Sequence, residues 1–266
     1  MESGPEPIME INGPITIWEA EPHTLFYNRP GWAAVQEFFS RIREAGDDME
    51  DLFATLRCRT DLADGAVLLP GFAISCAEQL LEGIRHLALE TPFRTMKTPG
   101  GRTLSVATTS CGDCGWYTDQ KGYRYVRTDP LTGKPWPQMP DMFFELACTA
   151  AKEAGYPDFS PSSCLINRYE PGAKMGLHQD RDEDDLSFPI VSVSLGVPAR
   201  FAFSGLLKTD PVQRHDLFHG DVVVWGGISR LAWHGVSPIR ETFHPQTGAM
   251  RYNLTFRAIN AALFQP

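Results

Sequence analysis

Residues 165–180 have the sequence LINRYEPGAKMGLHQD, the pattern of a strand, a turn and a second short strand. The turn falls at Glu-Pro-Gly, because proline and glycine interrupt regular structure. In an extended chain, side chains two residues apart point the same way, so His178 and Asp180 can present an imidazole and a carboxylate to one point. Two histidines and one carboxylate form the facial triad that holds Fe(II) and leaves coordination positions open. The segment therefore predicts two of the three ligands of such a site.

The length and composition are those of a globular protein rich in turns. With 266 residues the chain can form one large domain with an appendage, and its 23 glycines and 21 prolines indicate a β-rich chain. No apolar run reaches the roughly 18 residues of a membrane span, and the N-terminus lacks the pattern of a signal peptide. We therefore expect a cytoplasmic protein with no membrane segment, whose six cysteines are free thiols.

The acidic charge is concentrated at the N-terminus. Residues 1–51 carry eleven acidic residues against three arginines, which is −8 of the total net charge of −9. Apolar residues at helical spacing run from Trp32 to Ile42. We therefore expect residues 1–48 to be an acidic extension with one amphipathic helix, and residues 49–266 to be the folded domain.

A basic and aromatic segment lies in the middle of the chain. Between Arg94 and Lys134 there are seven lysines and arginines against three aspartates, and Trp116, Tyr123 and Tyr125 alternate with the cations. Aromatic rings can stack on bases and cations can neutralise phosphates, so the segment could bind nucleic acid. The alternative is a hairpin whose aromatic side chains pack inward.

The C-terminal half has short strand patterns separated by turn signals at intervals of 8–20 residues, which is typical of a sandwich or jelly roll. Two helices precede these strands and can cover one face of the sheet. The first is predicted from a capping-box pattern at Ser75 and Glu78 and extends to about Leu89. The second is predicted over 141–154, with Phe143 and Phe144 among its buried positions.

His234 is the best candidate for a third ligand. It lies in a predicted strand over 230–236, after an apolar run and 54 residues beyond Asp180, and a jelly roll brings such distant strands together. A single histidine is more often a hydrogen-bonded polar side chain, so the assignment depends on the His-x-Asp pair and on the last strand. Cys111 and Cys114 form a lone CxxC with no second pair, which favours free thiols over a zinc site.

The last predicted strand, residues 251–257, has one polar and one apolar face. An inward polar face is costly unless an anion binds there, and arginine can bind a carboxylate with two hydrogen bonds. Asn167 and Tyr169 also share a face and can donate to the same ligand. A facial triad beside a dicarboxylate pocket predicts a 2-oxoglutarate-dependent Fe(II) oxygenase, in which O2 takes the remaining position. The polar face consists of Arg251, Asn253, Thr255 and Arg257.

From about Gly65 to Arg257 the chain resembles the bacterial AlkB-type DNA/RNA repair dioxygenases. Many segments match in order, which is far more specific than a histidine and aspartate motif alone. The matched motifs are TPGG at Thr98, GW…GY.Y at 115–125, KPWP.MP at Lys134, AGYPDF at Ala154, LINRY.PGAK…HQD.DE at Leu165, PIVSVSLG at Pro189, HGDVVVWGG.SRL at His219 and RYNLTFR at Arg251.

The resemblance implies an α+β, mainly β fold: a double-stranded β-helix, or jelly roll, over about 160–258, with covering N-terminal helices and a nucleotide-recognition lid over about 93–130. It also implies oxidative demethylation of N-alkylated bases such as 1-methyladenine and 3-methylcytosine. The substrate would be single-stranded or double-stranded DNA, with RNA as a further candidate, and the enzyme a monomer. The enzyme would bind Fe(II) as its cofactor and consume 2-oxoglutarate and O2, and it would release formaldehyde, succinate and CO2.

The resemblance also assigns roles by position. Asp182 would meet the damaged, cationic base, and Trp116 would stack on that base opposite His178, with Tyr123 beside it in the lid. Lys208 stands where family members often have a substrate-contacting arginine. The implied iron ligands are His178, Asp180 and His234. The implied 2-oxoglutarate pocket is Asn167, Tyr169, Arg251 on the far carboxylate, Asn253, and Arg257 near the iron-bound carboxylate.

Three departures from the family pattern concern substrate preference and not the iron site. They are Lys208, Gly176 in place of a small polar residue, and Cys114. Two other hypotheses remain open. One is the same oxygenase chemistry on a protein or small molecule, which predicts no aromatic and basic lid. The other is a non-enzymatic jelly-roll binding module with a structural metal, which predicts no arginine pair on the last strand.

Overall fold

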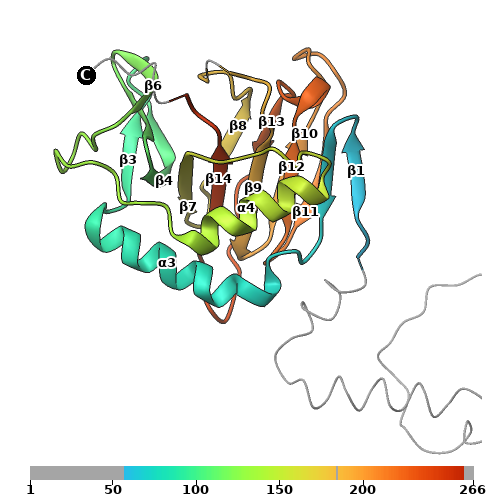
Figure 1. The fold of residues 1–266 in the computed structure, drawn as a ribbon, viewed down its shortest axis with the longest axis horizontal. Coiled ribbons are helices and arrows are strands. Elements are labelled where there is room, and N and C mark those ends of the chain that lie inside the picture. The colour runs from blue at the N-terminus through green and yellow to red at the C-terminus, as the bar shows by residue number, and fades with distance from the viewer. Residues whose placement is uncertain (1–56, 184, 261–266) are drawn as a thin grey trace, which may run out of the picture. The chain divides into compact units, whose positions relative to one another are not determined.

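The computed structural model describes residues 57–183 and 185–260, in which two sheets, a separate hairpin and two helices are found (Figure 1). The described strand pairs are antiparallel. The major sheet has the order β1 (Thr60–Ala63), β2 (Ala66–Leu69), β12 (Val222–Trp225), β9 (Ile190–Gly196), β14 (Arg251–Arg257), β7 (Ser163–Tyr169), β4 (Thr103–Gly112) and β3 (Arg94–Lys97). The minor sheet has the order β11 (Gln213–Leu217), β10 (Ala199–Phe203), β13 (His234–Val236) and β8 (Met175–His178).

The alternation of side chains along β9 and β14 gives the major sheet two different faces. On β9, Val191, Val193 and Leu195 enter the apolar core beneath the helices, while Ser192 and Ser194 point to the opposite face. On β14, Leu254 and Phe256 join the same apolar core, as the sequence predicts. The polar residues of both strands therefore face the minor sheet, and the functional site forms there.

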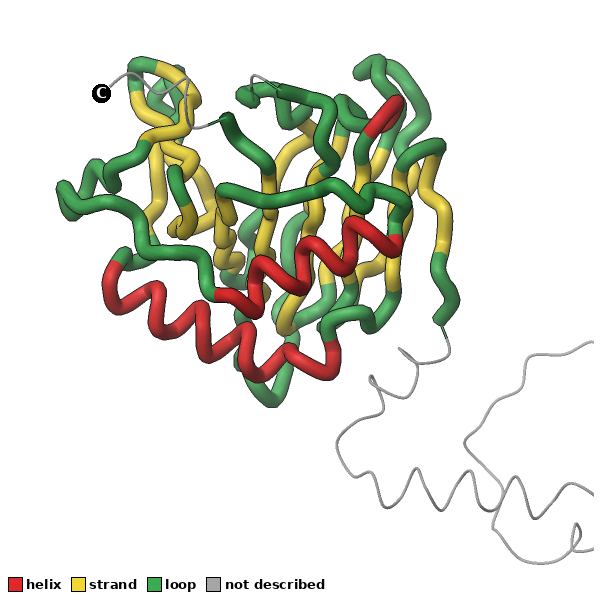
Figure 2. Tube along the Cα trace, viewed as in Figure 1, coloured by secondary structure: helices red, strands yellow, loops and turns green. Residues whose placement is uncertain are grey.

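Helices α3 (Ala77–Glu90) and α4 (Asp141–Glu153) cover the apolar face of the major sheet (Figures 1 and 2). The predicted capping box of α3 is wrong, because a 3-10 turn over Ile74–Cys76 precedes the helix and Cys76 takes the N-cap position with no side-chain cap. In α4 the prediction that Phe144 is buried is also wrong: it is 39% exposed, while Phe143 beside it is buried.

A second apolar core lies between the two sheets, and its presence confirms the predicted jelly roll. The indole of Trp225 on β12 packs against Phe201 and Phe203 of β10, with ring centroids 6.2 and 6.4 Å away. Leu217 of β11 and Ile190 of β9 complete this core. Since strands of both sheets contribute, the minor sheet is fixed over one end of the major sheet.

The strands differ from the predicted ones at three places. The strand predicted over 230–236 is shortened to β13, because a 3-10 turn at Gly227–Ser229 precedes it. Strand β11 is missed, since its mostly exposed polar sequence QRHDL carries no apolar alternation. In the predicted lid over 93–130, β3 and β4 extend the major sheet, and β5 (Gly115–Asp119) with β6 (Gly122–Val126) forms the separate hairpin.

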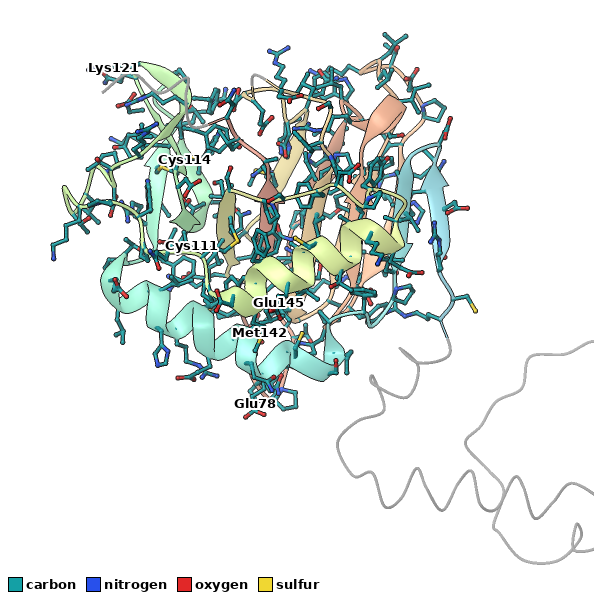
Figure 3. All side chains as sticks on the ribbon, in the orientation of Figure 1. Glu78, Cys111, Cys114, Lys121, Met142 and Glu145 are labelled. Carbon is teal, nitrogen blue, oxygen red and sulfur yellow. The ribbon has the colours of Figure 1, made fainter. Side chains whose placement is uncertain are left out.

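The predicted extension over 1–48 and its amphipathic helix lie outside the described residues, so the domain boundary stays a prediction. Within the described part of the chain, neither helix has the length and apolar character needed to cross a membrane. Cys111 and Cys114, labelled in Figure 3, are both fully buried, in line with free thiols.

The neighbouring phenylalanines of α4 provide a matched test of the core. Phe143 packs edge-on against Phe256 of β14, with ring centroids 6.3 Å apart. We expect Phe143→Ala to lower the free energy of unfolding by about 3–5 kcal/mol, because it opens a cavity between helix and sheet. Phe144→Ala should lower it by less than about 1 kcal/mol. Urea denaturation measures both, and equal losses would contradict the assigned helix face.

Candidate active site

A cavity of about 470 Å³ opens between the two sheets, and hairpin β5–β6 forms part of its wall. Residues of β7, β8, β9, β13 and β14 line it, together with Trp116 and Tyr123 of the hairpin. The structure brings together here the side chains to which the sequence assigned metal, cosubstrate and base contacts, with the exception of Lys208. This convergence makes the cavity the candidate active site.

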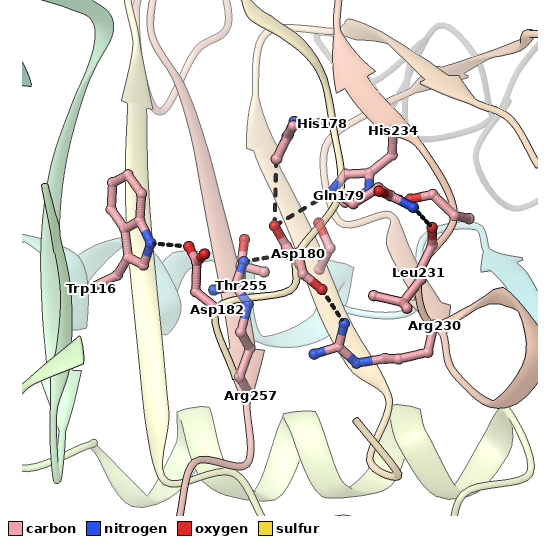
Figure 4. Close-up of polar contacts among 12 residues, drawn as sticks. Trp116, His178, Gln179, Asp180, Asp182, Arg230, Leu231, His234, Thr255 and Arg257 are labelled. Carbon is pink, nitrogen blue, oxygen red and sulfur yellow. Dashed lines mark hydrogen bonds and ion pairs between the residues drawn. The ribbon is translucent and has the colours of Figure 1, made fainter. Parts of the chain in front are cut away.

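His178, Asp180 and His234 form a group that can hold a metal ion, with their ligand atoms all within 4.8 Å of one another (Figure 4). Strands β8 and β13 pair with His178 directly opposite His234. The Asp180 Oδ1 atom lies 3.5 Å from Nε2 of His178 and 3.8 Å from Nε2 of His234. Strand pairing thus places the two imidazoles, and the His-x-Asp spacing adds the carboxylate.

Backbone carbonyls fix which nitrogen of each imidazole faces the group. The Nδ1 of His178 lies 2.8 Å from the Gly176 carbonyl, and the Nδ1 of His234 lies 3.0 Å from the Ala232 carbonyl. With the proton on each Nδ1 donated to that carbonyl, the lone pair of each Nε2 is available to a metal ion held between the two rings and Asp180. Orientation of ligating histidines through their second nitrogen is typical of metal sites.

The electrostatics of the group suit a cation. Burial and the neighbouring His178 ring lower the pKa of His234 to about 4, which keeps this imidazole neutral at pH 7. Burial raises the pKa of Asp180, but Arg257 and the two imidazoles outweigh it and hold the pKa well below its usual range. For His178 burial lowers the pKa, yet the contact with Asp180 outweighs it and the net direction is upward. A metal ion would bind the neutral form of this imidazole, as metal ligation requires.

Arg251 provides a buried docking point for an anion. Its side chain is 1% exposed, and its Nη2 donates to Ser194 Oγ at 3.0 Å. Among the described residues, Nε and Nη1 of Arg251 and Oδ1 of Asn167 have no hydrogen-bond partner. Buried donors left unsatisfied cost free energy, so an anionic ligand with carboxylate oxygens fits the cradle. The Arg251 guanidinium also lies 5.0 Å from the Tyr169 ring centroid.

The amides beside Arg251 are held in fixed orientations. Asn253 Nδ2 donates to Ser192 Oγ at 2.8 Å and to the Val193 carbonyl at 3.0 Å. Asn253 Oδ1 accepts from Thr255 Oγ1 at 2.9 Å and from Asn167 Nδ2 at 3.4 Å. The Asn253 amide is therefore held by hydrogen bonds on both its nitrogen and its oxygen.

The hairpin supplies an aromatic surface at the cavity. The rings of Trp116 and Tyr123 stack with centroids 5.6 Å apart and an angle of 19°, and the Trp116 Nε1 donates to Asp182 Oδ2 at 3.1 Å (Figure 4). Tyr123 is 47% exposed, whereas Tyr125 is buried and follows the inward-packing alternative. Two of the three aromatic residues singled out in the sequence thus remain available to a flat ligand.

Two of the substrate-preference positions lie at the edge of the cavity. Within the described chain, Lys208 is outside the cavity lining, and its ammonium lies 5.6 Å from the ring centroid of Trp233, which does line it. Gly176 lines the cavity, and a Cβ there would meet open space among the described residues. The lack of a side chain at Gly176 therefore leaves more free space in the cavity, and no neighbouring atom would prevent a larger residue there.

Glu183 and Arg230 are missed by sequence reasoning. The sequence places Glu183 in an acidic loop over 181–185, but its side chain is 2% exposed and pairs with Arg230 at 3.0 Å and with Arg257 at 3.2 Å. The family motif that begins at Leu165 ends at Glu183, but nothing in it indicates that this glutamate is buried or which residues it contacts.

Comparisons with known proteins agree with this geometry. The family model described as 2OG-Fe(II) oxygenase superfamily matches residues 65–257. The alpha-ketoglutarate-dependent dioxygenase AlkB of Escherichia coli (strain K12) is 58% identical over 210 residues, which cover 79% of this chain and 97% of that protein. The DNA N(6)-methyladenine demethylase ALKBH1C of Arabidopsis thaliana is 32% identical over 165 residues, which cover 52% of this chain and 36% of that protein.

Among solved structures, OsALKBH1 superimposes with a TM-score of 0.67 at 30% identity, covering 75% of this chain and 99% of that one. The fold, the grouped histidines and aspartate and the family match lead to one conclusion: the chain belongs to the 2OG-Fe(II) oxygenase superfamily and, within it, to the AlkB dioxygenases.

Proposed function

We propose that this dioxygenase removes methyl groups oxidatively from N-alkylated bases of the 1-methyladenine and 3-methylcytosine type in DNA, with RNA as a further substrate. One observation carries the proposal: a single cavity joins the histidine and aspartate group, an unsatisfied buried arginine and a stacked aromatic pair. The name of the Arabidopsis relative, a DNA base demethylase, points to the same substrate class.

In this proposal His178, Asp180 and His234 hold the iron. The bound Fe(II), with 2-oxoglutarate and O2, supplies the oxidising chemistry that turns the N-methyl group into a hydroxymethyl group, which leaves as formaldehyde. The protein contributes orientation, since β8 and β13 fix both imidazoles and their carbonyl contacts fix the ring nitrogens. Arg257, whose Nη2 lies 2.5 Å from Asp180 Oδ2, keeps the carboxylate ionised and oriented.

Arg251, which is buried on β14, would bind the cosubstrate. We assign the far carboxylate of 2-oxoglutarate to Arg251, whose Nε and Nη1 lack partners among the described residues. Asn167, Tyr169 and Asn253 line the same wall and would contact the remainder of the molecule. Arg257 lies beside the iron ligands and would face the carboxylate at the metal.

The hairpin would bind the base. Trp116 and Tyr123 present ring faces to a flipped base, a mode that base-modifying enzymes use. Asp182 would meet the alkylated base, whose positive charge a carboxylate favours over a neutral base. Lys208 would contact substrate phosphate from the cavity edge. The monomeric state, the cytoplasmic location and the preference between single and double strands stay predictions.

Two other functions are less well supported. A structural metal site is usually closed by four protein ligands, whereas this group offers three, and the His178 side chain is 40% exposed. An oxygenase acting on a protein or small molecule does not need the stacked aromatic pair, which remains the main support for a base as substrate.

Incubation with single-stranded DNA containing 3-methylcytosine, Fe(II) and 2-oxoglutarate tests the proposal. We expect formaldehyde and succinate in about equal amounts, because each oxidation consumes one cosubstrate. Unmethylated DNA of the same sequence is the control and should yield little formaldehyde. Succinate formation without formaldehyde from methylated DNA would reject the proposed substrate while leaving the oxygenase chemistry in place.

The iron assignment has a matched pair of histidine variants. His178→Ala should weaken Fe(II) binding more than about a hundredfold, because it removes one of three ligands. His86→Ala is the control, since His86 is an exposed histidine on α3 that contacts Glu82. Titration of the metal-free protein with Fe(II) under anaerobic conditions measures both affinities. Unchanged affinity in His178→Ala would show that iron binds elsewhere.

Replacement of the buried arginine tests the cosubstrate pocket. Arg251→Gln should raise the KM for 2-oxoglutarate about thirtyfold or more, since one partner of a buried charge pair is lost. Arg200→Gln is the control, because Arg200 is an exposed arginine paired with Asp216 on the minor sheet. Steady-state succinate production at varied 2-oxoglutarate gives both KM values. A normal KM in Arg251→Gln would place the far carboxylate at another residue.

A further inference from the structure

The Glu183 carboxylate is a buried junction between the hairpin and the iron site. Its side chain is 2% exposed, and each of its oxygens has a partner. Oε1 accepts a hydrogen bond from the Tyr125 hydroxyl at 2.6 Å and lies 3.2 Å from Arg257 Nε. Oε2 accepts from Arg230 Nη2 at 3.0 Å. One carboxylate thus joins β6 of the hairpin, β14 of the major sheet and the segment before β13.

Both arginines that hold Glu183 also hold Asp180. Arg257 Nη2 contacts the Asp180 carboxylate at 2.5 Å, and Arg230 Nη1 donates to the Asp180 backbone carbonyl at 2.7 Å (Figure 4). The Arg257 guanidinium is therefore shared between two buried carboxylates, and the Arg230 guanidinium is shared between the Glu183 carboxylate and the Asp180 backbone. Loss of one carboxylate would leave an arginine without a matching charge, which is strongly unfavourable in the interior.

The hairpin end of the junction lies beside the proposed base-binding surface. Tyr125 on β6 is the register partner of Trp116 on β5, and both belong to one apolar cluster with Cys114 and Ile259. Trp116 also donates to Asp182, the residue before Glu183. The short segment 180–183 therefore contacts the hairpin twice while supplying Asp180 to the metal group.

We propose that Glu183 is a positioning residue: it orients Arg257 and Arg230 around Asp180 and, through Tyr125, ties the hairpin to the iron site. The inference rests on the proposed iron role of Asp180 and goes beyond it by assigning a residue that touches neither the metal nor the base. The Glu183 carboxylate then couples the position of the hairpin to the position of Asp180.

Glu183→Gln keeps the shape of the side chain and removes its charge. In the full chain without DNA, we expect about tenfold faster hydrogen exchange of the hairpin amides over 115–126, because a hydrogen bond to a charged group is weakened. We also expect about tenfold weaker Fe(II) binding, since supporting contacts around a ligand carry that much affinity. Glu170→Gln, at an exposed carboxylate that contacts Arg168, is the control for both measurements.

Tyr125→Phe cuts only the connection to the hairpin. We expect about tenfold faster exchange over 115–126 and less formaldehyde released per succinate formed on methylated DNA. Tyr117→Phe makes the same chemical change on the same hairpin, at a tyrosine stacked with Arg124, and should alter neither quantity. A merely structural role for Glu183 would lower thermal stability without changing the product ratio of the folded enzyme.

If Glu183→Gln folds, unchanged hairpin exchange or unchanged Fe(II) affinity overturns the proposal. If it does not fold, the decision passes to Tyr125→Phe, where wild-type exchange or a wild-type product ratio overturns it. Hydrogen exchange and Fe(II) titration use no DNA, so they remain informative if the wild type releases no formaldehyde. A wild type that releases no formaldehyde would reject the proposed substrate, and hydrogen exchange and Fe(II) titration would then decide the role of Glu183.

Discussion

The alternation of side chains along β14 is the constraint on which the rest of the structure depends. Its apolar residues pack beneath the helices, so its polar residues, among them Arg251 and Arg257, must face the space between the sheets. Buried polar groups need partners, and β9 provides them with Ser192 and Ser194 on the matching face. At Arg251, two donors lack a partner among the described residues, and the carboxylate of a ligand would satisfy them. The same pattern that closes the core therefore also creates the cavity.

Charge pairing explains how the cavity wall remains stable around a metal group. The carboxylates of Asp180 and Glu183 both pair with Arg257, and Glu183 also pairs with Arg230, so two buried acids face two buried arginines. Burial of a single charge would be far more costly than burial of this set. The Asp180 carboxylate is consequently ionised and fixed in direction, and the neutral His234 imidazole stands beside it. Little reorganisation is needed to accept a cation.

The parts of the site that follow a local period could be predicted from the sequence. His178 and Asp180 are two residues apart on one chain, and the faces of the last strand follow from alternation, so both could be inferred without a structure. Glu183 could not, because its burial depends on two arginines and Tyr125 from three other segments. The orientation of Phe144 was likewise decided by where α4 meets the sheet, since two adjacent phenylalanines fit a helical period equally well.

The bond between Trp116 and Asp182 bears on how the proposed enzyme would select its base. In this structure the Asp182 carboxylate accepts the indole N–H, and the indole stacks on Tyr123, so the groups proposed to bind the base contact one another. A base that enters between them must offer at least an equal donor to Asp182. A neutral base with an amino group only replaces one hydrogen bond by another. A cationic alkylated base adds charge to that contact, and charge-assisted hydrogen bonds are roughly twice as strong as neutral ones. Selection of an alkylated base would then begin with competition between that base and Trp116 for the Asp182 carboxylate.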